Sequence, residues 1–249
     1  MGAGVTDRTC LVTGASRGIG RAIATELAED GATVVVNYRS AERAAHEVVE
    51  EIEAAGGTAY PVQADVTDRD AVERMREGIH DEIGAIDVLV NNAGINRDRL
   101  FSEMSHEDWE AVIDVCLNGA FNCTKAFYDD VREADHGRVV TVSSVIGKQG
   151  NVGQANYAAA KSGLFGFTRS IALELASSGA TANCVAPGFT RTSMVDGIPD
   201  DVQSKIKSEV PLDRFAEPEE VAAVVRFLAS EESGYVTGEV LDVNGGVDL

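Results

Sequence analysis

The sequence predicts an α/β fold with one domain over residues 1–249, in which helices cover both faces of a doubly wound parallel sheet of about seven strands. Two observations support this. Short runs rich in Val, Leu and Ile alternate with longer amphipathic stretches along the whole chain. The short runs are also almost continuously apolar, as parallel strands buried on both faces are.

The elements follow one another without a repeat, a low-complexity tract or a linker. Strands are expected at 9–12, 33–37, 58–62, 87–91, 138–143, 181–186 and 239–244. Helices are expected near 19–30, 41–55, 69–83, 106–132, 157–178 and 218–230. The segment 188–218 interrupts the last strand–helix–strand unit. Because it follows the carboxyl end of a strand, where such sheets bind ligands, we expect it to form a lid over the substrate.

Acidic residues dominate the charge, since 41 Asp and Glu against 21 Lys and Arg give a net charge of −20. Nucleic acid and anionic membranes are therefore not expected partners. Self-repulsion on this scale is screened only in concentrated salt. This predicts a halophile with a salty cytoplasm, and the alternative is an ordinary acidic bacterial protein.

No apolar run is long enough to span a membrane, and the first residues lack a basic region followed by an apolar core. We therefore expect a soluble, cytoplasmic protein. The four cysteines (Cys10, Cys116, Cys123 and Cys184) lack a short metal-ligand spacing, and the four histidines are scattered. This pattern predicts reduced structural thiols and no metal site.

The first strand is followed by TGASRGIG, whose glycines open a helix. Glycines let the backbone approach a pyrophosphate, and the helix N-terminus offers it unpaired N–H groups. This junction is typical of Rossmann-type folds and predicts a dinucleotide cofactor. The expected contacts are Gly14, Ser16, Arg17, Gly18, Ile19 and Gly20.

The end of the second strand indicates which dinucleotide is bound. Folds specific for NAD usually place a carboxylate there for the ribose 2′-hydroxyl, whereas this chain reads VVVNYRS. The residues offered are Asn37, Tyr38, Arg39 and Ser40. Since Arg39 and Arg17 can clamp a 2′-phosphate, we expect NADPH/NADP. The alternative is that Arg39 is only a solvated residue at a strand end.

Polar and glycine-rich groups also follow the later strands. Because the carboxyl ends of parallel strands converge on one crevice, these groups are expected to meet there. Further cofactor contacts are predicted from Asp65, Val66, Asn92, Ala93, Gly94, Pro187, Gly188, Thr190 and Thr192. Substrate contacts are predicted from Ser144, Gln154, Tyr157 and Gly188.

The stretch NYAAAK places Tyr157 and Lys161 four residues apart, and therefore on one face of a helix. Such a pair alone is common on solvated helices. Here it stands with TGASRGIG, NNAG, SSVIG, APG and VNGG, and together these motifs resemble the short-chain dehydrogenase/reductases over essentially the whole chain. The longer stretches GNVGQANYAAAKSGLFGFTRSIALELA and FLASEESGYVTGEVLDVNGG resemble the 3-oxoacyl-thioester reductases within that family.

The resemblance implies a mechanism and an assembly. Tyr157 donates a proton to the substrate oxygen while hydride arrives from the nicotinamide, and Ser144 polarises the same oxygen. Lys161 stabilises the phenolate and, by resemblance, binds the nicotinamide ribose together with Tyr157. The family also implies a homotetramer. One residue departs from the family pattern: Cys116 stands where an Asn is usual. The difference is either natural or engineered. Asn118, two positions further on, lies on another face of the helix and is not expected to replace the missing Asn.

Three functions stay open on the sequence. The first is reduction of the small-molecule substrate acetoacetyl-CoA, an acyl-CoA, to (R)-3-hydroxybutyryl-CoA for polyhydroxyalkanoate synthesis. Arg191, Lys148 or Arg214 can supply the basic spot that coenzyme A needs. The second is reduction of a 3-oxoacyl-acyl-carrier-protein in fatty-acid synthesis, although an acidic carrier suits an acidic surface poorly at low salt. The third is a non-catalytic NADPH sensor, which would not need the Ser, Tyr and Lys.

Overall fold

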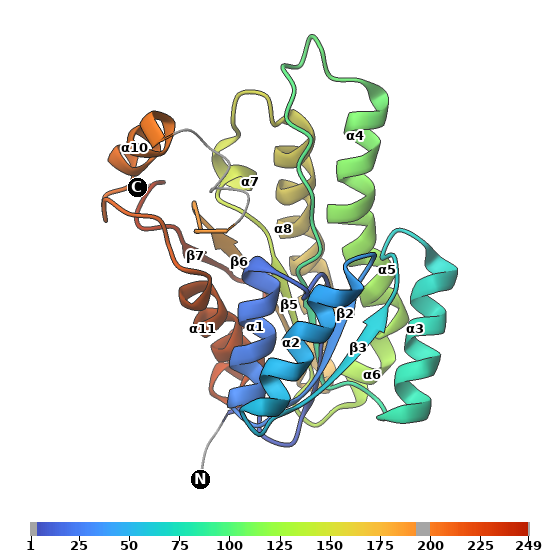
Figure 1. The fold of residues 1–249 in the computed structure, drawn as a ribbon. Helices are drawn as coiled ribbons and strands as arrows, with labels where there is room; N and C mark the ends of the chain where they lie inside the picture. The colour runs from blue at the N-terminus through green and yellow to red at the C-terminus, as the bar shows by residue number, and fades with distance from the viewer. Residues whose placement is uncertain (1–3, 193–199, 249) are drawn as a thin grey trace.

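The computed structural model describes residues 4–192 and 200–248. It confirms the predicted fold class, since all strand pairs of one sheet are parallel and the order is β3-β2-β1-β4-β5-β6-β7 (Figure 1). The strands are β1 Thr9–Val12, β2 Thr33–Tyr38, β3 Thr58–Gln63, β4 Val88–Asn91, β5 Arg138–Val142, β6 Thr181–Pro187 and β7 Val240–Val243. Every residue of β4, β5 and β6 is buried, which explains why apolar residues are not restricted to alternate positions in these strands.

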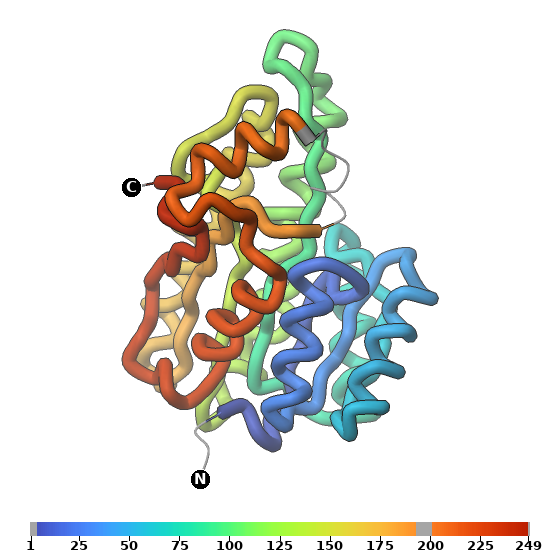
Figure 2. Tube along the Cα trace, turned by 60° about the vertical axis from the view of Figure 1, so that its left-hand side comes forward, coloured from blue at the N-terminus to red at the C-terminus, as the bar shows by residue number. Residues whose placement is uncertain are grey.

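Helices pack on both faces of this sheet. One apolar cluster joins α1, α2 and α11 to the sheet, and a second joins α3, α5 and α8 to its other face. Helices α1 and α11 come from opposite ends of the chain but lie side by side (Figures 1 and 2). The helices are α1 Gly18–Glu29, α2 Glu42–Ala54, α3 Arg69–Glu82, α4 His106–Ile113, α5 Gly119–Ala126, α6 Tyr128–Glu133, α7 Ile146–Gln149, α8 Ala155–Leu175, α10 Asp200–Glu209 and α11 Pro218–Ala229.

The prediction of one continuous helix over 106–132 is wrong, because the structure divides this stretch into several helices. A π-helical turn, η1 Asp114–Asn118, follows α4, and the Gly119 N–H donates to the carbonyl of Asp114, five residues back. A Cβ on Gly119 would lie 2.6 Å from Val66 Cγ2, so only glycine lets this turn pack so closely against the β3–α3 loop. Periodicity alone does not reveal such a turn, and π turns of this kind are frequent at functional sites.

Two further differences from the expected elements concern the ends of α8 and the segment 188–218. Helix α8 begins at Ala155 rather than at 157, and its last turn tightens into the 3₁₀ helix η2 Ala176–Ser178. The expected lid, 188–218, contains helix α10, which the sequence analysis did not predict. Residues 193–199 of that segment lie outside the described residues, so its role as a lid stays a prediction.

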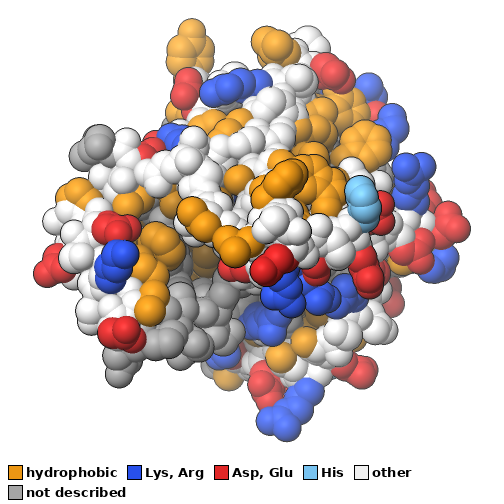
Figure 3. Space-filling view, turned by 90° about the horizontal axis from the view of Figure 1, so that it is seen from above, with side chains coloured by type: hydrophobic (Ala, Val, Ile, Leu, Met, Phe, Trp, Pro, Cys, Tyr) orange, Lys and Arg blue, Asp and Glu red, His pale blue; other side chains and the backbone are white. Residues whose placement is uncertain are grey.

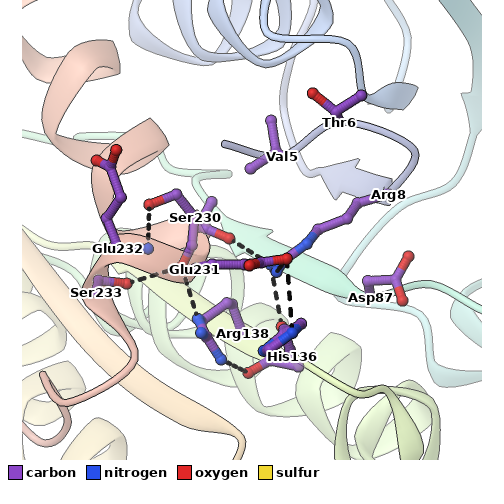
Figure 4. A network of polar contacts seen from close by, with 12 residues as sticks. Val5, Thr6, Arg8, Asp87, His136, Arg138, Ser230, Glu231, Glu232 and Ser233 are labelled. Atoms are coloured by element: carbon purple, nitrogen blue, oxygen red, sulfur yellow. Dashed lines mark hydrogen bonds and ion pairs between the residues drawn. The ribbon is translucent and has the colours of Figure 1, made fainter. Parts of the chain in front are cut away.

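A buried polar network joins the amino ends of β1 and β5 to the end of α11 (Figure 4). Arg8 Nη1 donates to the carbonyls of Ala229 (2.8 Å) and His136 (3.2 Å), and Arg138 Nε donates to that of Ser230 (3.1 Å). Burial and the neighbouring Arg8 lower the pKa of the Arg138 guanidinium to about 10. The carbonyl end of a helix favours positive charge, so the network holds α11 in place at the edge of the sheet away from the cleft described below.

Candidate active site

A cavity of about 620 Å³ lies at the carboxyl ends of the strands. Its lining comes from the segments that follow β1, β2, β3, β4, β5 and β6, together with the start of α8. It includes every residue predicted to contact the cofactor or the substrate: Gly14, Ser16, Arg17, Gly18, Ile19, Gly20, Asn37, Tyr38, Arg39, Ser40, Asp65, Val66, Asn92, Ala93, Gly94, Ser144, Gln154, Tyr157, Lys161, Pro187, Gly188, Thr190 and Thr192. The fold therefore brings these residues together around one space.

The glycine turn after β1 has the backbone shape that a phosphate-binding turn requires. Gly14 and Gly18 have φ values of 63° and 56°, which side-chain-bearing residues rarely adopt. A Cβ on Gly20 would lie 2.5 Å from the carbonyl of Gly14 and 2.4 Å from Asn92 Nδ2. The Thr13 hydroxyl accepts hydrogen bonds from the N–H groups of Asn92 and Ala93, so the turns after β1 and β4 are held together.

Asn37 is positioned differently from the other residues at the end of β2. Its side chain lines the cavity but is only 1% exposed, and its Oδ1 accepts from the Gly14 N–H at 3.3 Å. Its Nδ2 donates to the carbonyl of Ala64 at 3.2 Å. The amide therefore supports the glycine turn, and Arg39 and Ser40 are the exposed residues of this strand end, whereas Tyr38 lines the cavity but is only 6% exposed.

A second cavity, of about 460 Å³, lies beside the first and shares several lining residues with it. Three guanidinium groups line it, those of Arg17, Arg39 and Arg97. In the described part of the chain, none of the three forms an ion pair. Lys and Arg side chains also gather in one group near the middle of the face seen from above (Figure 3). Arg97 was missed by sequence reasoning because only the β4–α4 loop brings it to this place.

The basic spots expected for coenzyme A are already paired. Lys148 forms ion pairs with Asp242 and Asp248, and Arg191 Nε lies 2.9 Å from Glu217 Oε1. Arg214 holds both carboxylate oxygens of Glu220, and this contact lowers the pKa of Glu220 to about 2. A basic spot for coenzyme A at Arg191, Lys148 or Arg214 stays a prediction, and a ligand phosphate would have to compete there with these carboxylates.

Ser144, Tyr157 and Lys161 all line the first cavity. Tyr157 and Lys161 lie one turn apart on α8, and Lys161 Nζ is 5.6 Å from the centre of the Tyr157 ring. Lys161 is only 3% exposed, and its ammonium donates to the Val142 carbonyl at 2.8 Å. Ser144 stands just after β5 and is 9% exposed. A hydroxyl, a phenol and a buried ammonium thus border the same space.

Cys116 lies behind this group rather than in the cavity. Its thiol donates to the carbonyl of Ile95 at 3.4 Å, and it packs with Val112 and Ala160 in a small cluster that Tyr157 joins. Asn118 is exposed and donates to Asp114, as its helix position predicts. A Cβ on Gly94 would lie 3.5 Å from Cys116 Sγ and 3.6 Å from Lys161 Nζ. The π turn therefore brings the thiol to the back of the Gly94 turn that borders the cavity.

Sequence reasoning also missed the apolar and small residues that complete the walls. Several are direct neighbours of predicted residues, and their spacing carries no separate signal. The missed lining residues are Ala41, Ala64, Ile95, Asn96, Val115, Val142, Ser143, Ile146 and Phe189.

Comparison with known proteins agrees with this arrangement. A family model described as enoyl-(acyl carrier protein) reductase matches residues 14–248, and the chain belongs to the short-chain dehydrogenase/reductase family of oxidoreductases. The 3-oxoacyl-(acyl-carrier-protein) reductase of Synechocystis sp. is 49% identical over 244 residues, 98% of each chain. The corresponding reductase FabG of Staphylococcus aureus is 46% identical over 240 residues, and the acetoacetyl-CoA reductase of Allochromatium vinosum is 48% identical over 241; each match covers 96% of this chain and 98% of the relative. Within residues 4–192 and 200–248, no helix is long and apolar enough to cross a bilayer.

Proposed function

We propose that this protein catalyses the NADPH-dependent reduction of acetoacetyl-CoA to (R)-3-hydroxybutyryl-CoA for polyhydroxyalkanoate synthesis, in the cytoplasm. The observation that carries a reductase function is the meeting of Ser144, Tyr157 and Lys161 in the cavity that the glycine turn also borders. A protein that only senses a nucleotide has no need of a proton donor there. The acetoacetyl-CoA reductase of Allochromatium vinosum supports the choice of substrate.

The cavity suits a dinucleotide. Gly14 and Gly94 line it, and so do Gly18, Ile19 and Gly20 at the N-terminus of α1, where unpaired N–H groups favour a phosphate. When bound, the cofactor supplies the hydride. Tyr157 gives its hydroxyl proton to the substrate oxygen, and Ser144 donates a hydrogen bond to that oxygen, where negative charge develops. The buried Lys161 ammonium stabilises the phenolate that remains and binds the nicotinamide ribose.

The preference for NADPH rests on the guanidinium groups at the end of β2 and in the glycine turn. Arg17 and Arg39 border both cavities without an ion-pair partner in the described residues, so a phosphate dianion would neutralise them. We expect Arg39→Gln to raise KM for NADPH about tenfold or more, since a hydrogen bond to a charged group is worth about 1.5–3 kcal/mol. Steady-state kinetics with both cofactors measure the effect.

KM for NADH is the internal control, because NADH lacks the 2′-phosphate, and Arg39→Gln should leave it within about twofold. Arg43→Gln removes another exposed guanidinium, which pairs with Glu47 on α2 and does not line either cavity, and should change neither constant. A wild-type enzyme that uses NADH as well as NADPH would contradict the preference.

Reduction of the carrier-protein thioester is the second candidate. It is favoured by the carrier-protein reductases among the relatives and by the pairing of Lys148, Arg191 and Arg214, which weakens the case for a basic coenzyme A site. The kcat/KM values for acetoacetyl-CoA and acetoacetyl-acyl-carrier protein, both measured at the salt concentration of highest activity, decide between the two. If kcat/KM is lower for acetoacetyl-CoA than for acetoacetyl-acyl-carrier protein, acetoacetyl-CoA is not the preferred substrate.

A homotetramer is also part of the proposal. Large apolar side chains are exposed on α4, α5 and α8, among them Trp109 (37%), Phe121 (47%) and Leu173 (81%). Where such side chains form a contiguous apolar patch, the patch is typical of a face that binds another chain. Light scattering should then give four times the chain mass of 26.3 kDa.

Segment 188–218 is proposed as the lid that closes over the substrate.

Cys116 offers a test of the residues that lie behind Tyr157 and Lys161 without lining the cavity. Because an Asn is usual in the family at this position, we expect Cys116→Asn to raise kcat by about two- to tenfold, within what proton relay contributes to such reactions. The new amide would replace the thiol that now bonds to Ile95. Cys123→Asn is not a suitable control, because Cys123 lies in the core. Cys116→Ser, which keeps a small donor, serves instead, and equal kcat for wild type and Cys116→Asn would contradict the prediction.

A further inference from the structure

Asn156, the residue before Tyr157, has a side chain that is completely buried and fully bonded. Its Oδ1 accepts from the N–H of Tyr157 at 2.8 Å. Its Nδ2 donates to the carbonyl of Arg97 at 3.1 Å and to that of Asp108 at 3.0 Å. One amide thus uses both of its N–H groups and its oxygen on three different backbone positions.

The Tyr157 end of this arrangement compensates for a missing helix cap. Helix α8 begins at Ala155, and Gln154, at its N-cap position, makes no side-chain cap hydrogen bond. The first N–H groups of a helix have no partner within the helix, and that of Tyr157 is among them. Asn156 supplies the acceptor and so fixes the backbone that carries the Tyr157 ring.

The other two bonds reach the opposite wall. Arg97 follows Gly94, Ile95 and Asn96, which line the cavity, and Asp108 lies in the first turn of α4, just ahead of the π turn. Two exposed contacts join the same loops, from Gln154 Nε2 to Asp98 and from the Arg99 N–H to the carbonyl of Gly153. The connection through Asn156 starts from a fully buried side chain and is partly shielded from solvent, and shielded hydrogen bonds are less weakened by water than exposed ones.

We propose that Asn156 is a positioning residue, which holds the Tyr157 hydroxyl at the reacting distance by tying the start of α8 to the β4–α4 loop and to α4. This rests on the proposed role of Tyr157 as proton donor. Asn156 does not line the cavity, so it acts through Tyr157 and not on the substrate. Misplacement of a reacting group by about 1 Å can cost about 100-fold in rate.

Asn156→Asp keeps the hydrogen bond to Tyr157 but removes the two hydrogen bonds to Arg97 and Asp108. The carboxylate can still accept from the Tyr157 N–H, but it cannot donate, and it faces the carbonyls of Arg97 and Asp108. We expect kcat to fall about 10- to 100-fold, with the Kd for NADPH within about twofold of wild type. The solvent deuterium isotope effect on kcat should increase, because proton transfer becomes the slower step.

Asn183→Asp is the matched control. Asn183 is also fully buried, with Nδ2 donating to the Val236 carbonyl and Oδ1 accepting from the Glu239 N–H, but it lies in β6 and does not line the cavity. It should lower the melting temperature as Asn156→Asp does while leaving the isotope effect unchanged. An unchanged isotope effect and kcat in Asn156→Asp, or the same changes in both variants, would overturn the proposal.

Amide hydrogen exchange gives a readout that does not depend on the substrate. Residues 155–158 and 95–105 should exchange faster in Asn156→Asp than in wild type, and no faster in Asn183→Asp. Unchanged exchange in these two segments would contradict the claim that Asn156 connects α8 to the β4–α4 loop, even if the enzyme is active. A wild-type protein that reduces no 3-oxoacyl thioester would instead overturn the proposed function, and the exchange result would then decide whether Asn156 joins the two walls.

Discussion

Tyr157→Phe is expected to lower kcat at least about 1,000-fold, because it removes the hydroxyl that we propose gives its proton to the substrate oxygen. The ring itself should keep its place, since it packs in the cluster with Cys116 and Ala160 and lies beside the Lys161 ammonium. The Kd for NADPH should therefore stay within about threefold of wild type. Single-turnover kinetics and a fluorescence titration with NADPH measure the two quantities.

Tyr128→Phe provides the matched control for this change. Tyr128 also has a cation over its ring, with Arg132 at 6.0 Å, but it lies on α6 and does not line the cavity. Its loss of a hydroxyl should leave kcat unchanged. If Tyr157→Phe retained a tenth or more of wild-type kcat, another group would have to be the acid. Ser144→Ala would then be the next variant, since the Ser144 side chain also lines the cavity.

Salt is expected to have the second largest effect, on stability rather than on chemistry. A net charge of −20 on 249 residues opposes the compact state in dilute buffer, and helix α2 shows the local pattern. Its solvent face carries Glu50 and Glu53, which form no ion pair in the described residues, beside Glu47 and Glu51, which are paired. Raising KCl from about 0.1 M to about 2 M shortens the screening length to a few ångströms. We expect the melting temperature to rise by about 10 °C or more, which corresponds to a few kcal/mol in a chain of this size.

The salt prediction needs a control for effects other than screening. The double substitution Glu50→Gln and Glu53→Gln removes two unpaired charges without touching the core, so it should raise the melting temperature in dilute buffer more than in concentrated KCl. Sucrose at equal osmolality should reproduce only part of the KCl effect. A melting temperature and an activity that are highest in dilute buffer and decline with KCl would end the halophile hypothesis.

The sequence by itself determined the layers of this fold and the place of the cleft. Unbroken apolar runs such as VVV at 34–36 are stable only when both faces are covered, so they specify a parallel sheet between helix layers. Motifs directly after strands then have to lie at one edge, because all parallel strands end there. For this reason Gly14, Arg39 and Ser144 could be assigned to one crevice from their positions after strands, whereas Tyr157, on a helix, was assigned through the family resemblance.

The tertiary structure alone decided which polar groups stay available in that crevice. Asn37 and Lys148 were expected to serve ligands, but residues far away in the chain, Ala64 and Asp242, take up their hydrogen-bonding capacity. Arg97, by contrast, gains a place beside Arg17 and Arg39 that no motif marks. The packing of the π turn against Val66 and the two bonds of Asn156 to Arg97 and Asp108 are of the same kind. Each depends on contacts between segments that are distant in sequence, whereas hydrophobic periodicity and turn motifs report only what neighbouring residues do, so these features follow from how the layers pack.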